Sequence, residues 1–208
     1  MSQAGRGDEQ FTTWWSRNAH WLGVSLRVGF GTAWLIDGVM KFVWLAPSDV
    51  INLVQSSGQG QPSWLIPWYN FWTNLVSSNP AFALYGIGLW ELVLGFALVF
   101  GLMRKLAYLS GILLSLLIYS IDEGFGGPYG PGSTDIGAAI IYLFVFFALI
   151  ALESATASNS LTLDSIIERA TSKWASVAEF TSPAMRAHFE AQRKAIGQRH
   201  GQSTDSSP

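Results

Sequence analysis

The chain has 208 residues, of which half are hydrophobic and only 12% are charged, and its formal net charge is −2. Soluble domains carry about 25% charged residues, so this composition predicts an integral membrane protein. The chain has no cysteine, which excludes disulfides, iron–sulfur clusters, thioether-linked haem and cysteine-bound zinc on it.

A polar N-terminal segment, residues 1–20, precedes the first apolar segment and lacks the pattern of a cleaved signal peptide. We expect the first membrane span over residues 21–43, which contain Arg27, Asp37 and Lys41. Small residues recur on one side of this span at helical spacing, which indicates a close-packed helix interface. Arg27 lies near the start of the span, where a long side chain can reach the membrane surface.

The connection over residues 44–80 contains no Lys or Arg. Ser48 is expected to cap a short helix, and the Ser-, Gly- and Gln-rich residues 56–62 predict a loop. The aromatic residues that follow predict a helix lying in the membrane interface, with Pro67 in its first turn and an end at Asn79–Pro80.

Three further spans are expected over residues 81–102, 106–121 and 136–152. Glu91 lies near the middle of the second span, and Arg104–Lys105 forms a cationic turn before the third. Glu153 lies at the exit of the fourth span and is expected to be an ordinary interface residue. Beyond it, residues 160–180 predict one amphipathic helix, whose apolar face would use Leu163, Ile166, Ile167, Ala170, Trp174 and Val177.

These segments predict an all-α integral membrane protein. It would be a four-helix transmembrane bundle with interfacial helices in the first outer loop and an amphipathic C-terminal helix. Its parts would be an N-terminal segment over residues 1–20, a four-span membrane domain over residues 21–152, and an amphipathic and basic tail over residues 153–208.

The distribution of charge predicts the orientation of the chain in a plasma membrane. Lys and Arg precede the first span, form the turn at Arg104–Lys105 and recur in the tail, whereas residues 44–80 and 122–135 contain neither. By the positive-inside rule, both termini are expected on the cytoplasmic side, and these two loops on the outer face.

The loop over residues 122–135 is rich in glycine and proline, which specify backbone shape closely. It can be a tight turn that only joins two helices, with Ser133, Thr134 and Asp135 as helix caps. It can also be a site, because its carboxylates lie at the same depth as Asp37 and Lys41. On this second interpretation the candidate residues fall into two groups. The proton-handling group is Asp37, Glu91, Glu123 and Asp135, and the substrate-binding group is Lys41, Gly126, Gly127 and Tyr129.

Charged residues inside the spans need a partner or a function, because a charge in hydrocarbon costs at least ~2.5 kcal/mol. Asp37 and Lys41 are spaced to form an i, i+4 ion pair, which is either structural or part of the site. Glu91 has no cation in its own span, so we expect it to be a neutral acid bonded to a neighbouring helix unless Arg27, Lys41 or water reaches it.

Three segments resemble the DoxX/DoxD family of membrane proteins. Residues 27–42, with a Gly-x-x-Lys step ending at Lys41, resemble the first helix of that family. Residues 88–105 resemble its second helix and cytoplasmic turn, and residues 123–137 resemble the outer loop of the DoxD branch in particular. The resemblance extends over about residues 20–152 and is most specific in the loop.

The resemblance implies the activity class of the DoxD subunit of thiosulfate:quinone oxidoreductase, which couples two thiosulfates to tetrathionate and reduces a quinone. It also implies a second, DoxA-like protein subunit, because the tail here is short. Quinone would be the acceptor, and no haem, iron–sulfur cluster or metal is expected on this chain. A second hypothesis is a non-catalytic scaffold or anchor of a larger redox complex, and a third, weaker one is a small transporter. The expected partners are the lipid bilayer, quinone and other protein chains, with no nucleic acid.

Overall fold

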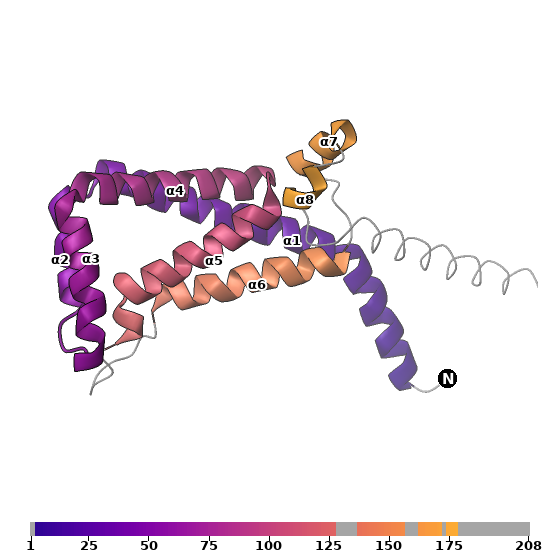
Figure 1. Cartoon of the computed structure of the whole chain (residues 1–208). Helices are drawn as coiled ribbons and strands as arrows, with labels where there is room; N and C mark the ends of the chain where they lie inside the picture. Colours follow the sequence, from indigo (N-terminus) through magenta and orange to yellow (C-terminus); the bar gives the residue numbers. More distant parts are fainter. Residues whose placement is uncertain (1–2, 128–136, 157–161, 172–173, 179–208) are drawn as a thin grey trace, which may run out of the picture.

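A computed structural model describes residues 3–127, 137–156, 162–171 and 174–178. Over these residues the secondary structure is helical, without a strand. Four long helices pack side by side in Figure 1: α1 (Gln3–Val43), α4 (Pro80–Phe100), α5 (Arg104–Ile121) and α6 (Ala138–Thr156). The expected all-α class is therefore confirmed for the described part of the chain.

Two of these helices, α4 and α5, are long and apolar enough to cross a membrane by themselves. A third candidate span is the part of α1 over Trp21–Val43 taken together with α2 (Pro47–Ser57), a pair bent by 114°. The apolar part of α6, Ala138–Ser154, is shorter. Large apolar side chains are exposed along α4, α5 and α6, as on a surface that faces lipid; they include Leu89, Val93, Leu113, Leu116, Phe144 and Phe147. These helices indicate a helical membrane protein.

The helix α1 begins well before the expected first span, since it runs without a break from Gln3. Figure 1 shows its N-terminal part projecting beyond the other long helices. The polar residues before Trp21 therefore extend a helix whose apolar part packs in the bundle. The other three long helices lie within a few residues of the expected spans.

The helices α1 and α4 approach each other through paired glycines. A Cβ atom at Gly31 would lie 3.0 Å from the Gly95 carbonyl oxygen, and one at Gly95 would lie 2.8 Å from the Gly31 carbonyl oxygen. One seven-residue step along each helix, a Cβ at Gly38 would lie 3.0 Å from the Gly88 carbonyl oxygen. Backbones this close leave no room for larger side chains, so the small residues on α1 form the helix interface that their spacing predicts.

The core between the other helices is aromatic. Phe146 of α6 is fully buried and packs on Gly111 of α5. The rings of Phe30 and Trp34 of α1 meet Phe146 and Tyr142 of α6 with centroids 5.0–6.3 Å apart. These edge-on and tilted contacts add specific geometry to the burial of apolar surface.

Two short helices, α2 and α3 (Ile66–Ser78), lie across one end of the bundle, which we call the loop end (Figure 1). Pro67 occupies the first turn of α3, as the sequence predicts. The prediction that Ser48 caps α2 is wrong, because Pro47 opens the helix and the Ala46 N–H donates to Asp49 Oδ2 over 2.8 Å. A short 3₁₀ helix, η1 (Ser63–Leu65), joins α2 to α3.

The opposite end, which we call the tail end, carries α7 (Leu163–Ala170) and α8 (Ala175–Ala178). The sequence predicts one helix here, and the structure has two. The break comes at Thr171, whose extended backbone (φ −144°, ψ 101°) ends α7. A β-branched residue at a helix end favours this conformation.

Candidate functional site

A cation shared by two acids lies between α1 and α4. Lys41 Nζ is 3.0 Å from Asp37 Oδ2 and 2.8 Å from Glu91 Oε1. The side chain of Glu91 is fully buried, that of Lys41 is 16% exposed and that of Asp37 is 47% exposed. We call these three residues the loop-end triad. It extends from the surface of the bundle to its interior.

The close approach of α1 and α4 at their paired glycines determines the position of the triad. Gly38 and Gly88 bring α1 and α4 together one turn from Lys41, and a Cβ at Gly88 would lie 3.2 Å from Lys41 Cβ. Glu91 stands one turn further along α4, on the face that packs against α1. Lys41 therefore reaches Glu91 from α1. The sequence leaves open whether Arg27, Lys41 or water reaches Glu91, and the structure shows that Lys41 does.

The triad gives its buried acid few partners. Lys41 Nζ donates to Asp37 Oδ2 over 3.0 Å and lies 2.8 Å from Glu91 Oε1, the distance of a charge-assisted hydrogen bond, whereas Glu91 Oε2 has no hydrogen-bond partner among the described residues. Buried polar groups without partners are costly and uncommon in structural cores. The arrangement therefore suits a site that binds or moves a proton better than a purely structural ion pair.

Glu123 caps the N-terminus of α6. Its Oε1 accepts from the Ala138 N–H over 2.9 Å, and its Oε2 accepts from the Ala139 N–H over 3.0 Å. These are amides that an α-helix leaves without intrahelical acceptors, and the carboxylate also complements the positive end of the helix dipole. Among the described residues, the N-terminal cap of α6 is therefore Glu123, which follows the end of α5. Asp135 and Tyr129, with Ser133 and Thr134, lie outside the described residues.

Asp122 lies next to the triad, just beyond the end of α5. Burial raises its pKa to about 6; Lys41 opposes this rise, whereas Glu123 and Asp37 add to it. Lys41 and Asp37 act on Asp122 from α1, so the triad and the start of the loop share one electrostatic environment. The expected convergence of Asp37, Lys41, Asp122 and Glu123 at one end of the bundle is confirmed for these four residues.

Gly126 and Gly127 form a turn rather than an open anion cradle. The Gly126 N–H donates to the Glu123 carbonyl over 2.8 Å, and the Gly127 N–H donates to the Gly124 carbonyl over 3.0 Å. The short helix η2 (Gly124–Gly126) contains Phe125 at φ +59°, where glycine is usually needed. The Tyr119 hydroxyl fixes this turn by donating to the Phe125 carbonyl over 2.7 Å.

The helices α2 and α3 close the C-terminal end of α5. Such ends leave carbonyl groups without partners. The Trp68 indole and the Tyr69 hydroxyl both donate to the Ser120 carbonyl, over 3.3 and 3.2 Å. The Ser57 hydroxyl donates to the Asp122 carbonyl, and Gln61 Nε2 donates to the Gly124 carbonyl over 2.8 Å. The helices α2 and α3, with the residues that join them, therefore form a fixed cover over the loop end.

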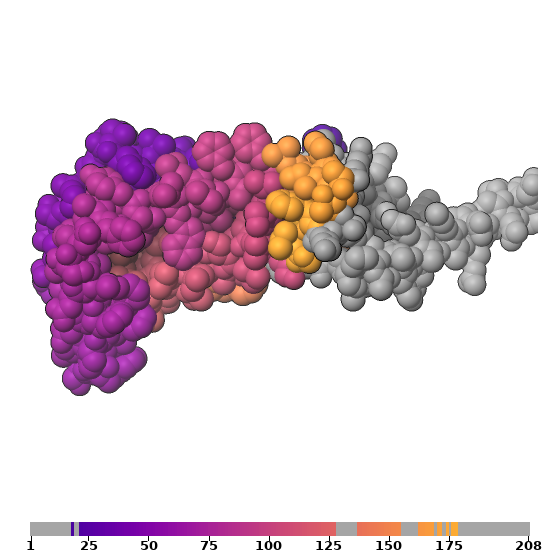
Figure 2. Space-filling view, turned by 45° about the horizontal axis from the view of Figure 1, so that its top comes forward, coloured from indigo at the N-terminus to yellow at the C-terminus, as the bar shows by residue number. Residues whose placement is uncertain are grey.

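An apolar cavity of about 450 Å³ lies beneath this cover, between α2, α3, α4 and α5. Its lining includes Val54, Trp72, Trp90, Leu117 and Asp122. Figure 2 shows a recess where α3 meets α4 and α5. Cavities of roughly 300–1,000 Å³ are typical of sites for small molecules. The sequence did not predict this cavity, because its walls come from four separate segments.

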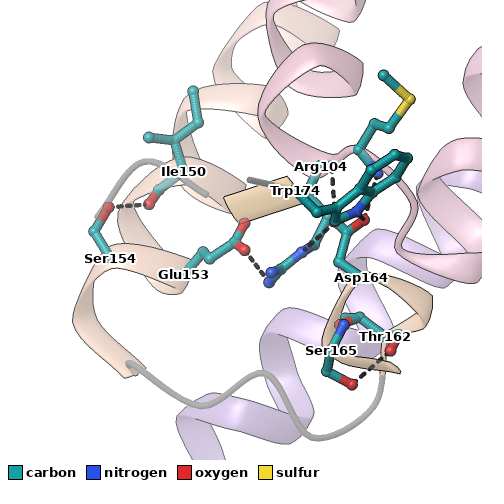
Figure 3. A network of polar contacts seen from close by, with 9 residues as sticks. Arg104, Ile150, Glu153, Ser154, Thr162, Asp164, Ser165 and Trp174 are labelled. Carbon is teal, nitrogen blue, oxygen red and sulfur yellow. Dashed lines mark hydrogen bonds and ion pairs between the residues drawn. The ribbon is translucent and has the colours of Figure 1, made fainter. Parts of the chain in front are cut away.

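A second buried charged cluster lies at the tail end (Figure 3). Arg104 contacts Glu153 through Nη1, and its Nε lies 3.1 Å from Asp164 Oδ2. Asp164, which is fully buried, also accepts from the Met103 N–H, the Arg104 N–H and Trp174 Nε1 over 2.8–3.1 Å. We call Arg104, Glu153, Asp164 and Trp174 the tail-end network.

This network overturns one expectation. Glu153 is not an ordinary interface residue, since it pairs with a buried arginine. Arg104, in the cationic turn that the sequence predicts, is only 3% exposed. The tail supplies the counter-charge: Asp164 holds α7 against the start of α5. The amphipathic pattern of the tail gave no sign of a buried aspartate.

Among the described residues, no group of three or more His, Cys, Asp or Glu side chains is placed to hold a metal ion. Comparisons with family models, with curated proteins and with solved structures find no match to this chain. The functional interpretation therefore rests on the triad, the loop and the cavity.

Proposed function

We propose that this chain is the membrane subunit of a quinone-linked oxidoreductase of the thiosulfate type. In this proposal, thiosulfate is oxidised to tetrathionate and the electrons pass to a quinone. The proposal also holds that α1, α4, α5 and α6 all cross the plasma membrane. The termini would then be cytoplasmic, and the loop end would face outward. The likeness of residues 123–137 to the DoxD outer loop supports the proposal.

The observation that carries it is the loop-end triad. Reduction of a quinone to a quinol consumes two electrons and two protons. Carboxyl groups in a membrane interior can supply those protons when one of them reaches the surface of the bundle, as Asp37 does. Lys41 would hold a quinone carbonyl or a sulfur oxyanion by charge and hydrogen bonding. Glu91, fully buried and in contact with Lys41, would carry a proton inward.

The electrons would come from a second, DoxA-like protein, because two thiosulfates release two electrons when they couple to tetrathionate. The role of this chain would be to bind quinone and deliver protons. The separation of roles explains why the triad contains acids and a lysine but no redox-active side chain.

The direct test uses purified protein in lipid vesicles with a soluble quinone analogue and thiosulfate, and membranes of parent cells from which this chain has been deleted supply the partner chains. Quinone reduction should depend on this protein and fall at least tenfold with Lys41→Gln. Lys105→Gln, which removes a cation at the opposite end of the bundle, is the matched control. Equal rates with and without the protein would overturn the proposal.

The orientation has its own test. Because the chain has no cysteine, a single thiol introduced by Gln59→Cys or by Gln202→Cys is the only one present. A membrane-impermeant maleimide added to intact cells should label the first variant and leave the second unlabelled. The opposite pattern would place the loop end in the cytoplasm.

A scaffold or anchor subunit is the second candidate, and the tail-end network favours it. Asp164 fixes α7 to the bundle while Ile166 of the same helix stays 62% exposed. A held helix with an exposed apolar residue can dock a partner chain. A scaffold should co-purify in fixed ratio with cofactor-bearing chains, and Lys41→Gln should leave the activity of that complex unchanged.

A further inference from the structure

The helix α7 is fixed to the bundle by one side and leaves its apolar side exposed. Residues three, four and seven positions apart share one side of an α-helix, so Leu163, Ile166 and Ala170 form one stripe. Leu163 is 38% exposed, Ile166 is 62% exposed, and Ala170 is exposed as well. Asp164 is fully buried in the tail-end network. This network therefore holds α7 in place without covering the stripe, which we call the α7 stripe.

The attachment of α7 sets its position along the bundle. The Asp164 N–H donates to the Gly101 carbonyl over 3.2 Å, and a Cβ atom at Gly101 would lie 2.8 Å from Thr162 Cβ. Leu163 lies between these two contacts in the chain, and Gly101 directly follows Phe100, the last residue of α4. Figure 2 shows α7 and α8 against the tail end of the long helices. The α7 stripe therefore begins where α4 ends.

The end of α4 coincides with the edge of a bilayer's hydrocarbon core. With 21 residues, α4 is about 31 Å long, and the hydrocarbon core is about 30 Å thick. Near this end, Phe96 and Phe100 are 54% and 49% exposed, and their rings stack with centroids 5.9 Å apart. When α4 crosses the membrane, Gly101 lies at the boundary between acyl chains and headgroups. Amphipathic helices lie in a membrane at this depth, with their apolar side in the lipid.

We propose that α7 is an interfacial helix and that the α7 stripe inserts into the lipid surface at the tail end. The stripe continues the apolar surface that Phe96 and Phe100 present to lipid. It offers two large apolar side chains, whereas a stable protein interface buries about 800 Å² on each partner, so lipid fits it better than a partner chain. The inference rests on the crossing of the membrane by α4, which is part of the proposed function, and not on oxidoreductase activity.

The test measures the membrane depth of single spin labels, which is possible because the chain has no cysteine. Ile166→Cys, Ser165→Cys, Leu113→Cys and Gln59→Cys are each labelled with a nitroxide in the full-length protein in phosphatidylcholine nanodiscs. The ratio of collisions with oxygen, which enters hydrocarbon, to collisions with a water-soluble nickel chelate reports depth. At Ile166 this ratio should be at least threefold higher than in the polar loop at Gln59. It should stay below the ratio at Leu113, which is 51% exposed in the middle of α5.

Two controls tie the depth to the α7 stripe. Ser165 lies on the other side of α7 at helical spacing, so its label should give a ratio close to that at Gln59. Leu163→Gln, added to Ile166→Cys, makes the stripe more polar and should lower the ratio at Ile166 at least twofold. Leu53→Gln changes a leucine of similar exposure, 43%, at the loop end and should leave that ratio unchanged. Melting curves show whether each variant is folded.

Three results would overturn the inference. If Leu113 gives the high ratio of a lipid-facing residue and Ile166 gives the ratio of Gln59, the bundle crosses the membrane but α7 lies in water. If Ile166 becomes protected from both reagents only when membranes of parent cells are added, a partner chain covers the stripe. If the ratio at Ile166 rises only when phosphatidylglycerol is added to the nanodiscs, charge and not the stripe draws α7 to the lipid. A low ratio at Leu113 would instead contradict the membrane crossing itself.

Discussion

The two ends of the bundle bury charge in different ways. At the tail end, Asp164 accepts hydrogen bonds from two backbone amides, a guanidinium and an indole, and Arg104 also pairs with Glu153. At the loop end, one lysine serves two acids, and Glu91 Oε2 has no hydrogen-bond partner among the described residues. A buried charge with many partners specifies structure, whereas one with few partners is available for chemistry.

Removing Asp164 should have the largest effect on stability. Asp164→Ala leaves four donors without an acceptor and takes one counter-charge from Arg104, so we expect a loss of about 3–5 kcal/mol in the free energy of unfolding. Thermal unfolding in detergent measures it. The control Asp49→Ala removes an exposed cap on α2 and should cost only about 1 kcal/mol. Equal losses would mean that the tail-end network is not structural.

Removing Lys41 should destabilise the protein less. Lys41→Met leaves Asp37 and Glu91 without a cation, but a proton can replace it because Asp37 is half-exposed. We expect a loss of about 1–3 kcal/mol, and recovery of most of it in Lys41→Met combined with Glu91→Gln. Unfolding of the two single variants and the double variant gives the coupling. A loss as large as that of Asp164→Ala would erase the contrast between the two ends.

The cap of α6 by Glu123 predicts a smaller, local effect. Glu123→Ala removes the acceptor for two amides and should cost about 1–2 kcal/mol. Gly137→Ala places a methyl group against the Glu123 carboxylate at a residue with φ +92°, so it should disturb the same cap. Because both changes act on one contact, their effects in the double variant should be less than additive. Hydrogen exchange at the start of α6 and melting curves measure this.

The smallest expected effect is a pH dependence at the loop end. Since the pKa of Asp122 rises from 3.8 to about 6 in the folded chain, its contribution to stability is fully present below pH 3.8 and is lost as the pH rises through 6. Asp122 is partly exposed, so the change should be only about 1 kcal/mol. Asp122→Asn should match the parent chain below pH 4 and be slightly more stable above pH 6. A constant difference across this range would contradict it.

The sequence predicts the long helices well and the buried contacts poorly. Apolar length is a property of one segment, so α4 and α5 appear in the sequence almost as they are in the structure. Small residues at helical spacing indicate that α1 packs closely, but they do not name the partner. Pro67 marks the start of α3 because the ring of proline restricts its own backbone.

The features that the sequence does not predict depend on contacts between segments that are distant in the chain. From the sequence, Asp164 looks like a solvated residue of an amphipathic tail. It is buried because it binds Arg104, which lies 60 residues earlier in the chain. Glu123 looks like a loop acid, and it caps a helix that starts 15 residues later. The cavity has no sequence signal at all, since four segments build it. The predicted catalytic and binding roles at the loop end stay predictions.

The paired glycines of α1 and α4 also have a mechanical consequence. Sliding one helix along the other by a single residue, about 1.5 Å, would drive Leu35 or Leu92 into the facing backbone, where no space is left. The helices α1 and α4 therefore behave as one rigid unit that holds Lys41 and Glu91 together. Any change of shape that opens the interior has to come from α5 and α6 moving relative to α1 and α4. Such a motion would change the cavity, which α5 helps to line, and leave the triad intact.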